Sequence, residues 1–158
     1  MLRWLLLSLL VIALDQASKI WVENSFELYE RLPLTGFFNL TLVYNQGAAF
    51  SFLADAGGWQ RWFFTILAVV ISAVLIGWLR RLQSHETLLA VSLALLIGGA
   101  LGNLIDRIAY GHVIDFLDVY YQQWHWPAFN LADSAITLGV ILFIWDALFN
   151  QSSKDSIN

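Results

Sequence analysis

The chain contains no cysteine among its 158 residues, which excludes a disulfide framework, a thiolate metal site and a cysteine nucleophile. Charged residues make up only 13% of the sequence, which is too few to cover a water-soluble globule of this size. The net charge of −4 provides no basic surface, so nucleic acid is not an expected partner. Hydrophobic residues make up 59%, and together with eight tryptophans they indicate a helical integral membrane protein.

Four apolar segments are close to the roughly 20 residues that cross a bilayer. The second and third contain no charged residue, whereas the first contains Asp15 and Lys19 and the fourth contains Asp146. A soluble bundle with buried helices would need polar helix faces that are missing here. We therefore expect an all-α membrane protein with one domain over 1–158 and spans at 4–22, 62–79, 88–105 and 134–149.

The first segment could be mistaken for a cleavable signal peptide, with Arg3 ahead of an apolar run. The residues that follow include no convincing small-x-small cleavage site, so we interpret the segment as an uncleaved span. Arg80 and Arg81 lie in the short connection between spans two and three. The positive-inside rule then predicts cytoplasmic termini, with 23–61 and 106–133 on the periplasmic side. The Lys and Arg residues do not all lie on the predicted cytoplasmic side, because four of them fall on the outer side: Lys19, Arg31, Arg61 and Arg107.

The first outer stretch contains the strongest β pattern. Residues 37–44 are rich in aromatic and β-branched side chains, which predicts a strand after a turn at 33–36. Asn45-Gln46-Gly47 is a plausible second turn, and 48–53 a second apolar strand. We expect a small periplasmic sheet between the first two spans, with an apolar face on the bilayer surface.

Ionisable and amide side chains at membrane depth are costly, so each needs a partner or a function. Asp15 and Lys19 are four residues apart on one helix face and can pair, either as a structural ion pair or in catalysis. Small residues from Gly98 onward allow close helix approach, and they lead to Asn103. Arg107 could extend its side chain toward water, or it could hold a carboxylate or a phospholipid headgroup.

Asp115 and Asp133 are the most informative acidic pair. Asp115 follows the third span in a short extended run, and Asp133 lies in the first turn of the fourth span. Adjacent helices pack about 8–10 Å apart, so the two carboxylates can meet at one outer mouth and share a proton. Such a pair can activate water against an amide. Taken singly, Asp133 could simply cap its helix, and Asp115 could be a surface carboxylate.

Other mechanisms find less support. The chain has no G-x-S-x-G, H-E-x-x-H or P-loop motif, and Ser18 points to a different helix face from Lys19. A metal site would have to draw on four candidate ligands: His112, Asp115, Asp118 and His125. Asp115 and Asp118 are three apart in an extended run, which turns their side chains to opposite faces.

Five blocks stand out along the chain: Asp15-Gln-Ala-Ser-Lys19, Asn45-Gln-Gly-Ala-Ala-Phe-Ser51, Gly99-Ala-Leu-Gly-Asn-Leu-Ile-Asp-Arg107, Gly111-His-Val-Ile-Asp-Phe116 and Phe129-Asn-Leu-Ala-Asp-Ser134. In these blocks and their order the sequence resembles the bacterial lipoprotein signal peptidase, or signal peptidase II, family. With the four spans the blocks cover nearly the whole chain.

The resemblance implies an aspartic peptidase of the inner membrane, with its active site at the periplasmic surface and no metal or organic cofactor. Its substrates would be prolipoproteins already modified with diacylglycerol, which it cuts on the amino side of the lipidated cysteine. Membrane lipid is the other expected partner, and no oligomeric partner is evident. The matching catalytic pair is Asp115 and Asp133. The matching supporting residues are Asp15, Lys19, Asn45, Asn103, Arg107, Asn130 and Ala132.

Two rival functions remain open. A non-enzymatic membrane protein, such as a small transporter subunit, would spread ionisable residues through the midplane. A metal-dependent lipid phosphotransferase would lose its activity in chelator.

Overall fold

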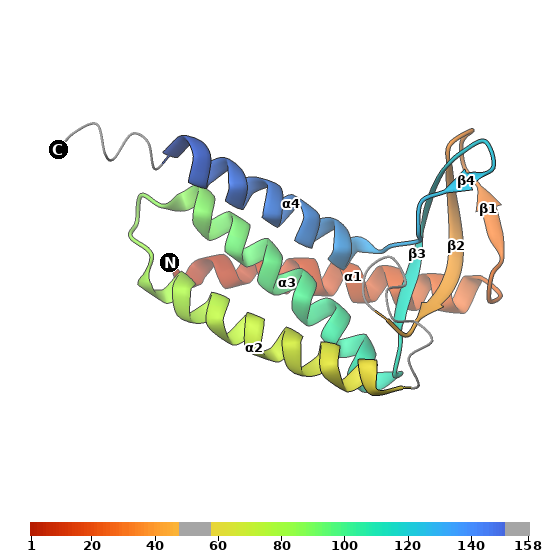
Figure 1. Ribbon diagram of the computed structural model, residues 1–158, viewed down its shortest axis with the longest axis horizontal. Coiled ribbons are helices and arrows are strands. Elements are labelled where there is room, and N and C mark those ends of the chain that lie inside the picture. Colours follow the sequence, from red (N-terminus) through yellow and green to blue (C-terminus); the bar gives the residue numbers. More distant parts are fainter. Residues whose placement is uncertain (48–57, 151–158) are drawn as a thin grey trace.

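A computed structural model describes residues 1–47 and 58–150. The four long helices of this described part run side by side, and a small sheet crosses one end of the bundle (Figure 1). The helices are α1 (Leu5–Ser25), α2 (Trp59–Arg81), α3 (Thr87–Ala109) and α4 (Leu131–Trp145). A 3-10 turn (Leu2–Trp4) precedes α1, and a π-helical turn (Asp146–Asn150) follows α4.

Each helix is long and apolar enough to cross a membrane. The spans are Leu2–Ser25, Trp59–Arg81, Thr87–Ala109 and Leu131–Phe149. The expected four-span fold class is confirmed, but every span except the last continues past both of its predicted ends. The third shows why: Asp106 and Arg107 extend the helix because both side chains are buried against partners.

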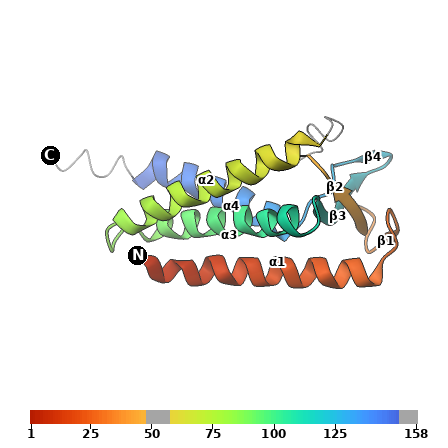
Figure 2. The same cartoon turned by 90° about the horizontal axis from the view of Figure 1, so that it is seen from below.

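Helix α3 is the centre of the bundle. It buries 61% of its most apolar stretch, whereas the other three helices bury 17–22% and turn the remainder outward, as lipid-facing helices do. Figure 2 shows α1 and α2 on opposite sides of α3. Small residues permit this close packing: a Cβ atom on Gly98 would lie 2.8 Å from the Cβ of Val11.

Hydroxyl groups also join the helices. The Ser8 hydroxyl donates to the carbonyl of Ala94 at 2.7 Å, and the Ser92 hydroxyl donates to the carbonyl of Gly139 at 2.9 Å. Each bond satisfies a polar group that lipid could not. The α1–α3 and α3–α4 contacts are therefore fixed in register.

The sheet is antiparallel with the strand order β1-β2-β3-β4. Its strands are β1 (Arg31–Pro33), β2 (Phe38–Asn45), β3 (Val113–Tyr121) and β4 (Trp124–His125). The prediction of a strand at 37–44 is confirmed, and the expected strand at 48–53 lies outside the described residues. The sheet is larger than expected, because β3 and β4 come from the second outer stretch.

The sheet packs on the end of α1 through a small apolar core formed by Val22, Leu42, Ile114 and Phe116. Gly111 makes the tight turn from α3 into β3, with a φ of +83° that side-chain-bearing residues rarely adopt. Because β3 follows α3 at once and pairs with β2, the middle of β3 lies over the ends of the helices. This arrangement places Asp115 next to the start of α4.

Candidate active site

Asp115 lies on β3 with only 1% of its surface exposed, so its interpretation as a surface carboxylate is wrong. The Asn45 Nδ2 atom donates to one of its oxygens at 2.9 Å, and the Asn130 Nδ2 atom donates to the other at 2.7 Å. Burial raises the pKa of Asp115 to about 7, and the nearby Asp133 carboxylate adds to the shift. The group can therefore exchange a proton near neutral pH.

Asp133 lies in the first turn of α4, where it was expected. The helix is capped by Asn130, whose Oδ1 atom accepts the backbone N–H of Asp133 at 2.9 Å. The Asp133 carboxylate is turned toward α3 instead, where it accepts the Nδ2 group of Asn103 at 2.7 Å. Capping by its side chain is thus not the role of Asp133, because Asn130 fills that role.

Asn103 and Asn130 connect the two carboxylates. The Nδ2 group of Asn130 donates to Asp115 and also lies 3.1 Å from the Oδ1 atom of Asn103. The structure therefore brings the predicted pair, Asp115 and Asp133, into one hydrogen-bond network. We call Asn45, Asn103 and Asn130 the amide network.

Each member of the amide network is oriented by a group that can only donate. The Lys19 ammonium donates to Asn103 Oδ1 at 3.0 Å, the Asp133 N–H donates to Asn130 Oδ1, and the Gly47 N–H donates to Asn45 Oδ1 at 2.9 Å. With its oxygen occupied in this way, each asparagine must turn its NH₂ group toward a carboxylate. The amide groups therefore cannot rotate to present an oxygen to Asp115 or Asp133, and each carboxylate faces an NH₂ donor.

Lys19 anchors this arrangement inside the bundle. It lies 2.8 Å from Asp15 and 2.7 Å from Asp106, and all three side chains are almost fully buried. The predicted Asp15–Lys19 pair is confirmed. The other oxygen of Asp15 accepts the backbone N–H of Ala132 at 2.9 Å, which ties α1 to the first turn of α4.

Asp106 is a site residue that the sequence analysis missed. It was counted as an outer-loop residue, whereas it lies on α3 with no exposed surface and also accepts from Gln16 at 2.8 Å. The available signal was its spacing. Asp106 stands three residues after Asn103, which places both side chains on one helix face toward Lys19.

Arg107 is 9% exposed, so its extension toward water is also a wrong interpretation. Its guanidinium donates to the carbonyls of Asn103 at 3.2 Å and Gly47 at 3.1 Å, and it lies over the Phe64 ring at 5.5 Å. In the described residues these bonds reach backbone carbonyls. Arg107 thus ties the turn after β2 to α3, beside the amide network.

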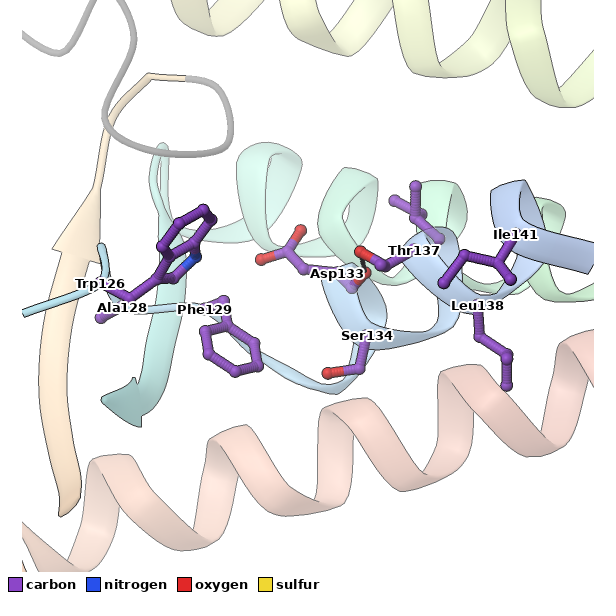
Figure 3. Close-up of a pocket in the computed structure, with 9 residues that line it drawn as sticks. Trp126, Ala128, Phe129, Asp133, Ser134, Thr137, Leu138 and Ile141 are labelled. Carbon is purple, nitrogen blue, oxygen red and sulfur yellow. Dashed lines mark hydrogen bonds between the residues drawn. The ribbon is translucent and has the colours of Figure 1, made fainter. Parts of the chain in front are cut away.

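Two grooves meet at Asp133. The larger, of about 580 Å³, runs along α4, and Figure 3 shows Trp126 and Phe129 on one side of Asp133 and Leu138 and Ile141 on the other. We call it the α4 groove. Its lining is Trp126, Ala128, Phe129, Asp133, Ser134, Ile136, Thr137, Leu138 and Ile141.

The second groove, of about 190 Å³, lies between α2 and α4 over α3, and we call it the α2–α4 groove. Its lining is Phe64, Leu67, Ala68, Ile71, Ala100, Asn103, Arg107, Asp133 and Ile136. Both grooves are mainly apolar. A carboxylate where two apolar grooves join suits a substrate that carries long apolar parts and reacts at a polar centre.

The four candidate metal ligands do not converge. Within residues 1–47 and 58–150, no three histidine or acidic side chains are grouped as a metal site requires. His125 bonds to Asp118, while His112 packs against the ring of Tyr44 with centroids 4.1 Å apart. Burial lowers the pKa of His112. The candidates thus belong to separate clusters.

Comparison with known proteins agrees with this architecture. The family model for signal peptidase (SPase) II matches residues 7–149. A lipoprotein signal peptidase of Pseudomonas fluorescens is 55% identical over 99% of this chain and 94% of its own length. One from Cupriavidus taiwanensis is 58% identical over 93% of this chain and 83% of its own length.

A solved bacterial membrane enzyme superposes with a TM-score of 0.86 at 32% identity, covering 96% of this chain and 91% of that one. A second solved bacterial membrane enzyme gives a TM-score of 0.81, also at 32% identity, over 93% of both chains. The described helices and sheet therefore have experimental counterparts. Together with the match over nearly the whole sequence, these likenesses show that the chain is a multi-pass bacterial membrane protein that belongs to the signal peptidase II family.

Proposed function

We propose that this protein is an aspartic endopeptidase that removes signal peptides from diacylglyceryl-modified prolipoproteins. It cuts on the amino side of the lipidated cysteine. Family membership supports the substrate class, because the curated relatives are named lipoprotein signal peptidases. The observation that carries the chemistry is the joining of Asp115 and Asp133 by one amide network.

In this mechanism the carboxylate pair holds one proton. The ionised member takes a proton from water as the water oxygen attacks the scissile carbonyl carbon. The tetrahedral intermediate then collapses, the C–N bond breaks, and the leaving nitrogen receives a proton from the pair. The products are a signal peptide with a new carboxylate and a lipoprotein with a free α-amine on its cysteine. The proton belongs to Asp115 and Asp133 jointly, since coupled groups titrate as a pair.

The supporting residues keep the pair in position. Asn45 and Asn130 hold Asp115, Asn103 holds Asp133, and Lys19 fixes the direction in which Asn103 donates. This division assigns orientation to the amides and proton transfer to the carboxylates. No metal or organic cofactor is required.

The backbone around the site is held by three further residues, Asp15, Ala132 and Arg107. Asp15 holds the N–H of Ala132 in the first turn of α4, and Arg107 holds the turn after β2 in which Gly47 orients Asn45. Arg107→Ala and Asn45→Ala variants are expected to lose most of their cleavage. If both variants cleave at the normal rate, the assignment of Arg107 and Asn45 to the site is wrong.

The grooves suit a substrate that is anchored in lipid. We infer that the helical signal peptide enters the α2–α4 groove from the bilayer and that acyl chains occupy the α4 groove, so that the scissile bond meets Asp133 where the grooves join. The site lies at the sheet end of the bundle, which is the periplasmic face of the inner membrane in the orientation that the basic residues favour.

The positions of the charged groups weigh against a transport pathway. Asp15, Lys19 and Asp106 form one cluster beside Asn103 and the first turn of α4, and α2 contains no ionisable residue between Arg61 and Arg80. A pathway through the midplane would require such groups along its length.

The test uses purified protein in detergent with a synthetic prolipoprotein peptide, either with or without diacylglycerol on its cysteine. We expect cleavage of the modified peptide alone, product masses that place the cut before the cysteine, and the same rate with chelator present. Equal cleavage of both peptides would contradict the substrate assignment. Loss of activity in chelator would favour a metal-dependent enzyme.

A further inference from the structure

A second polar cluster lies on the sheet, away from the amide network. Asp118 is 4% exposed, and its carboxylate accepts a hydrogen bond from Asn39 Nδ2 at 2.8 Å. The two residues lie opposite each other on the paired strands β2 and β3. The His125 Nδ1 atom donates to the same carboxylate, at 2.9 and 3.0 Å from its two oxygens. His125 thereby fastens β4 to the middle of the sheet.

The cluster carries a structural cost. The Oδ1 atom of Asn39 is buried without a hydrogen-bond partner in the described part of the chain, because its NH₂ group is turned to Asp118. A buried carbonyl that gives up its partners in this way is unfavourable. The Asn39 NH₂ group is nonetheless turned to Asp118, and this bond keeps the carboxylate fixed for His125.

The hairpin that carries His125 has little stability of its own. Strand β4 is only two residues long, and the turn before it contains Gln122 with a φ of +57°, a conformation suited to glycine or asparagine. The His125 ring stacks on Tyr120 with centroids 5.2 Å apart. Side-chain contacts with Asp118 and Tyr120 thus hold a hairpin that its local sequence disfavours.

The segment that follows forms one wall of the α4 groove. Trp126 comes directly after His125, and its backbone N–H donates to Val119 at 2.8 Å. Phe129 exchanges backbone bonds with Leu117 in both directions, at 2.8 and 3.1 Å, just before Asn130. The end of the segment next to the carboxylate pair is thus fixed by β3, whereas Trp126 contacts the hairpin through its bond to Val119 and through its ring contact with Trp124, with centroids 5.7 Å apart.

We propose that Asp118 and His125 are positioning residues that hold Trp126 as the wall of the α4 groove and so set the affinity for the apolar part of the substrate. This inference rests on the proposed function. It separates two parts of the site, since the amide network governs the chemical step and the Asp118–His125 pair governs binding.

The experiment measures KM and kcat for the diacylglyceryl-modified peptide with His125→Ala, His125→Asn and Trp126→Leu, and with the double variant His125→Ala/Trp126→Leu. Asparagine at 125 can still donate to Asp118 and is the conservative variant. The control is His85→Ala, which alters an exposed histidine at the opposite end of the bundle.

We expect KM to rise about tenfold in His125→Ala, the size expected for one hydrogen bond to a charged group, with kcat changed less than twofold. His125→Asn should recover most of this loss, and His85→Ala should match wild type. In the double variant the two effects should not add, because His125 acts through Trp126.

Other outcomes overturn the proposal. A fall in kcat at constant KM would place His125 with the carboxylate pair, and additive effects would show that it acts apart from Trp126. If His125→Ala does not fold, failure of the folded His125→Asn variant to keep a near-normal KM would contradict the inference equally. Failure of the proposed function would look different, because wild type itself would not cleave the peptide.

Discussion

Asp115 titrates in the folded protein far above its ordinary range, and replacing it by asparagine removes that titration. Its pKa rises from 3.8 to about 7, first because the group is buried and second because Asp133 lies nearby. Between these values the folded chain keeps a proton that the unfolded chain has released, so stability falls as pH rises. At about 1.4 kcal/mol per unit, the loss from this group alone is on the order of 4 kcal/mol.

An asparagine at 115 removes the cost of ionising a buried carboxyl group, but it introduces a smaller cost because one hydrogen-bond acceptor is lost. Asn45 and Asn130 donate to the two oxygens of Asp115, and an asparagine at 115 can offer only one oxygen. One donor would then face an NH₂ group, at a cost of about 1–3 kcal/mol. The removal of the buried charge is the larger effect above pH 7. At pH 5 the folded chain is still protonated but the unfolded chain is mostly ionised, so on the order of 1.5 kcal/mol of the loss is already present in wild type, and this roughly offsets the penalty.

We therefore expect the Asp115→Asn variant to be more stable than wild type at pH 8 and no more stable at pH 5. The gain at pH 8 should be about 1–3 kcal/mol, which corresponds to several degrees in Tm for a chain of this size. Thermal unfolding in detergent at both pH values measures it, with Asp146→Asn at the far end of α4 as the control. A variant less stable than wild type at pH 8, or a difference independent of pH, would refute the reasoning.

Further substitutions test the packing behind the site. Lys19→Met leaves Asp15 and Asp106 buried without their counter-charge and should lower the free energy of unfolding by about 3–5 kcal/mol. Adding Asp106→Asn to Lys19→Met should recover part of the lost stability. If Lys19→Met alone is as stable as wild type, the buried ion pairs of Lys19 with Asp15 and Asp106 are contradicted. Gly102→Ala places a Cβ atom 2.7 Å from an Asp15 oxygen and should lower stability by about 1–3 kcal/mol. Gly77→Ala meets nothing within 4 Å and should be neutral or stabilising in the same unfolding assay; equal effects would contradict the close packing.

The spans could be predicted from the sequence because lipid imposes a simple rule of length and apolarity. Their ends could not, because a charged residue normally marks the end of a span, whereas Asp106 and Arg107 are buried by partners distant in sequence. Asp106 pairs with Lys19 across 87 positions, and no local pattern records such a contact. Spacing alone placed Asp15 and Lys19 together, because their contact lies within one helix.

The sheet shows the same limit. The composition of 37–44 predicted a strand, yet the pairing of β2 with β3 joins segments on either side of two membrane spans. That pairing buries Asp115 and sets its bond with Asn45, so the environment of the carboxylate could not be read from its own loop. The resemblance to the signal peptidase II family implied a set of candidate site residues. The structure supplies the contacts among them.

The most direct test of the proposed mechanism compares cleavage of the diacylglyceryl-modified peptide by wild type, Asp115→Asn, Asp133→Asn and the control Asp146→Asn, each shown to be folded. Asparagine keeps the size of aspartate and removes the proton that the pair must exchange. We predict that neither variant of the pair cleaves and that Asp146→Asn cleaves like wild type. Near-normal turnover by either variant of the pair would contradict the shared-proton mechanism.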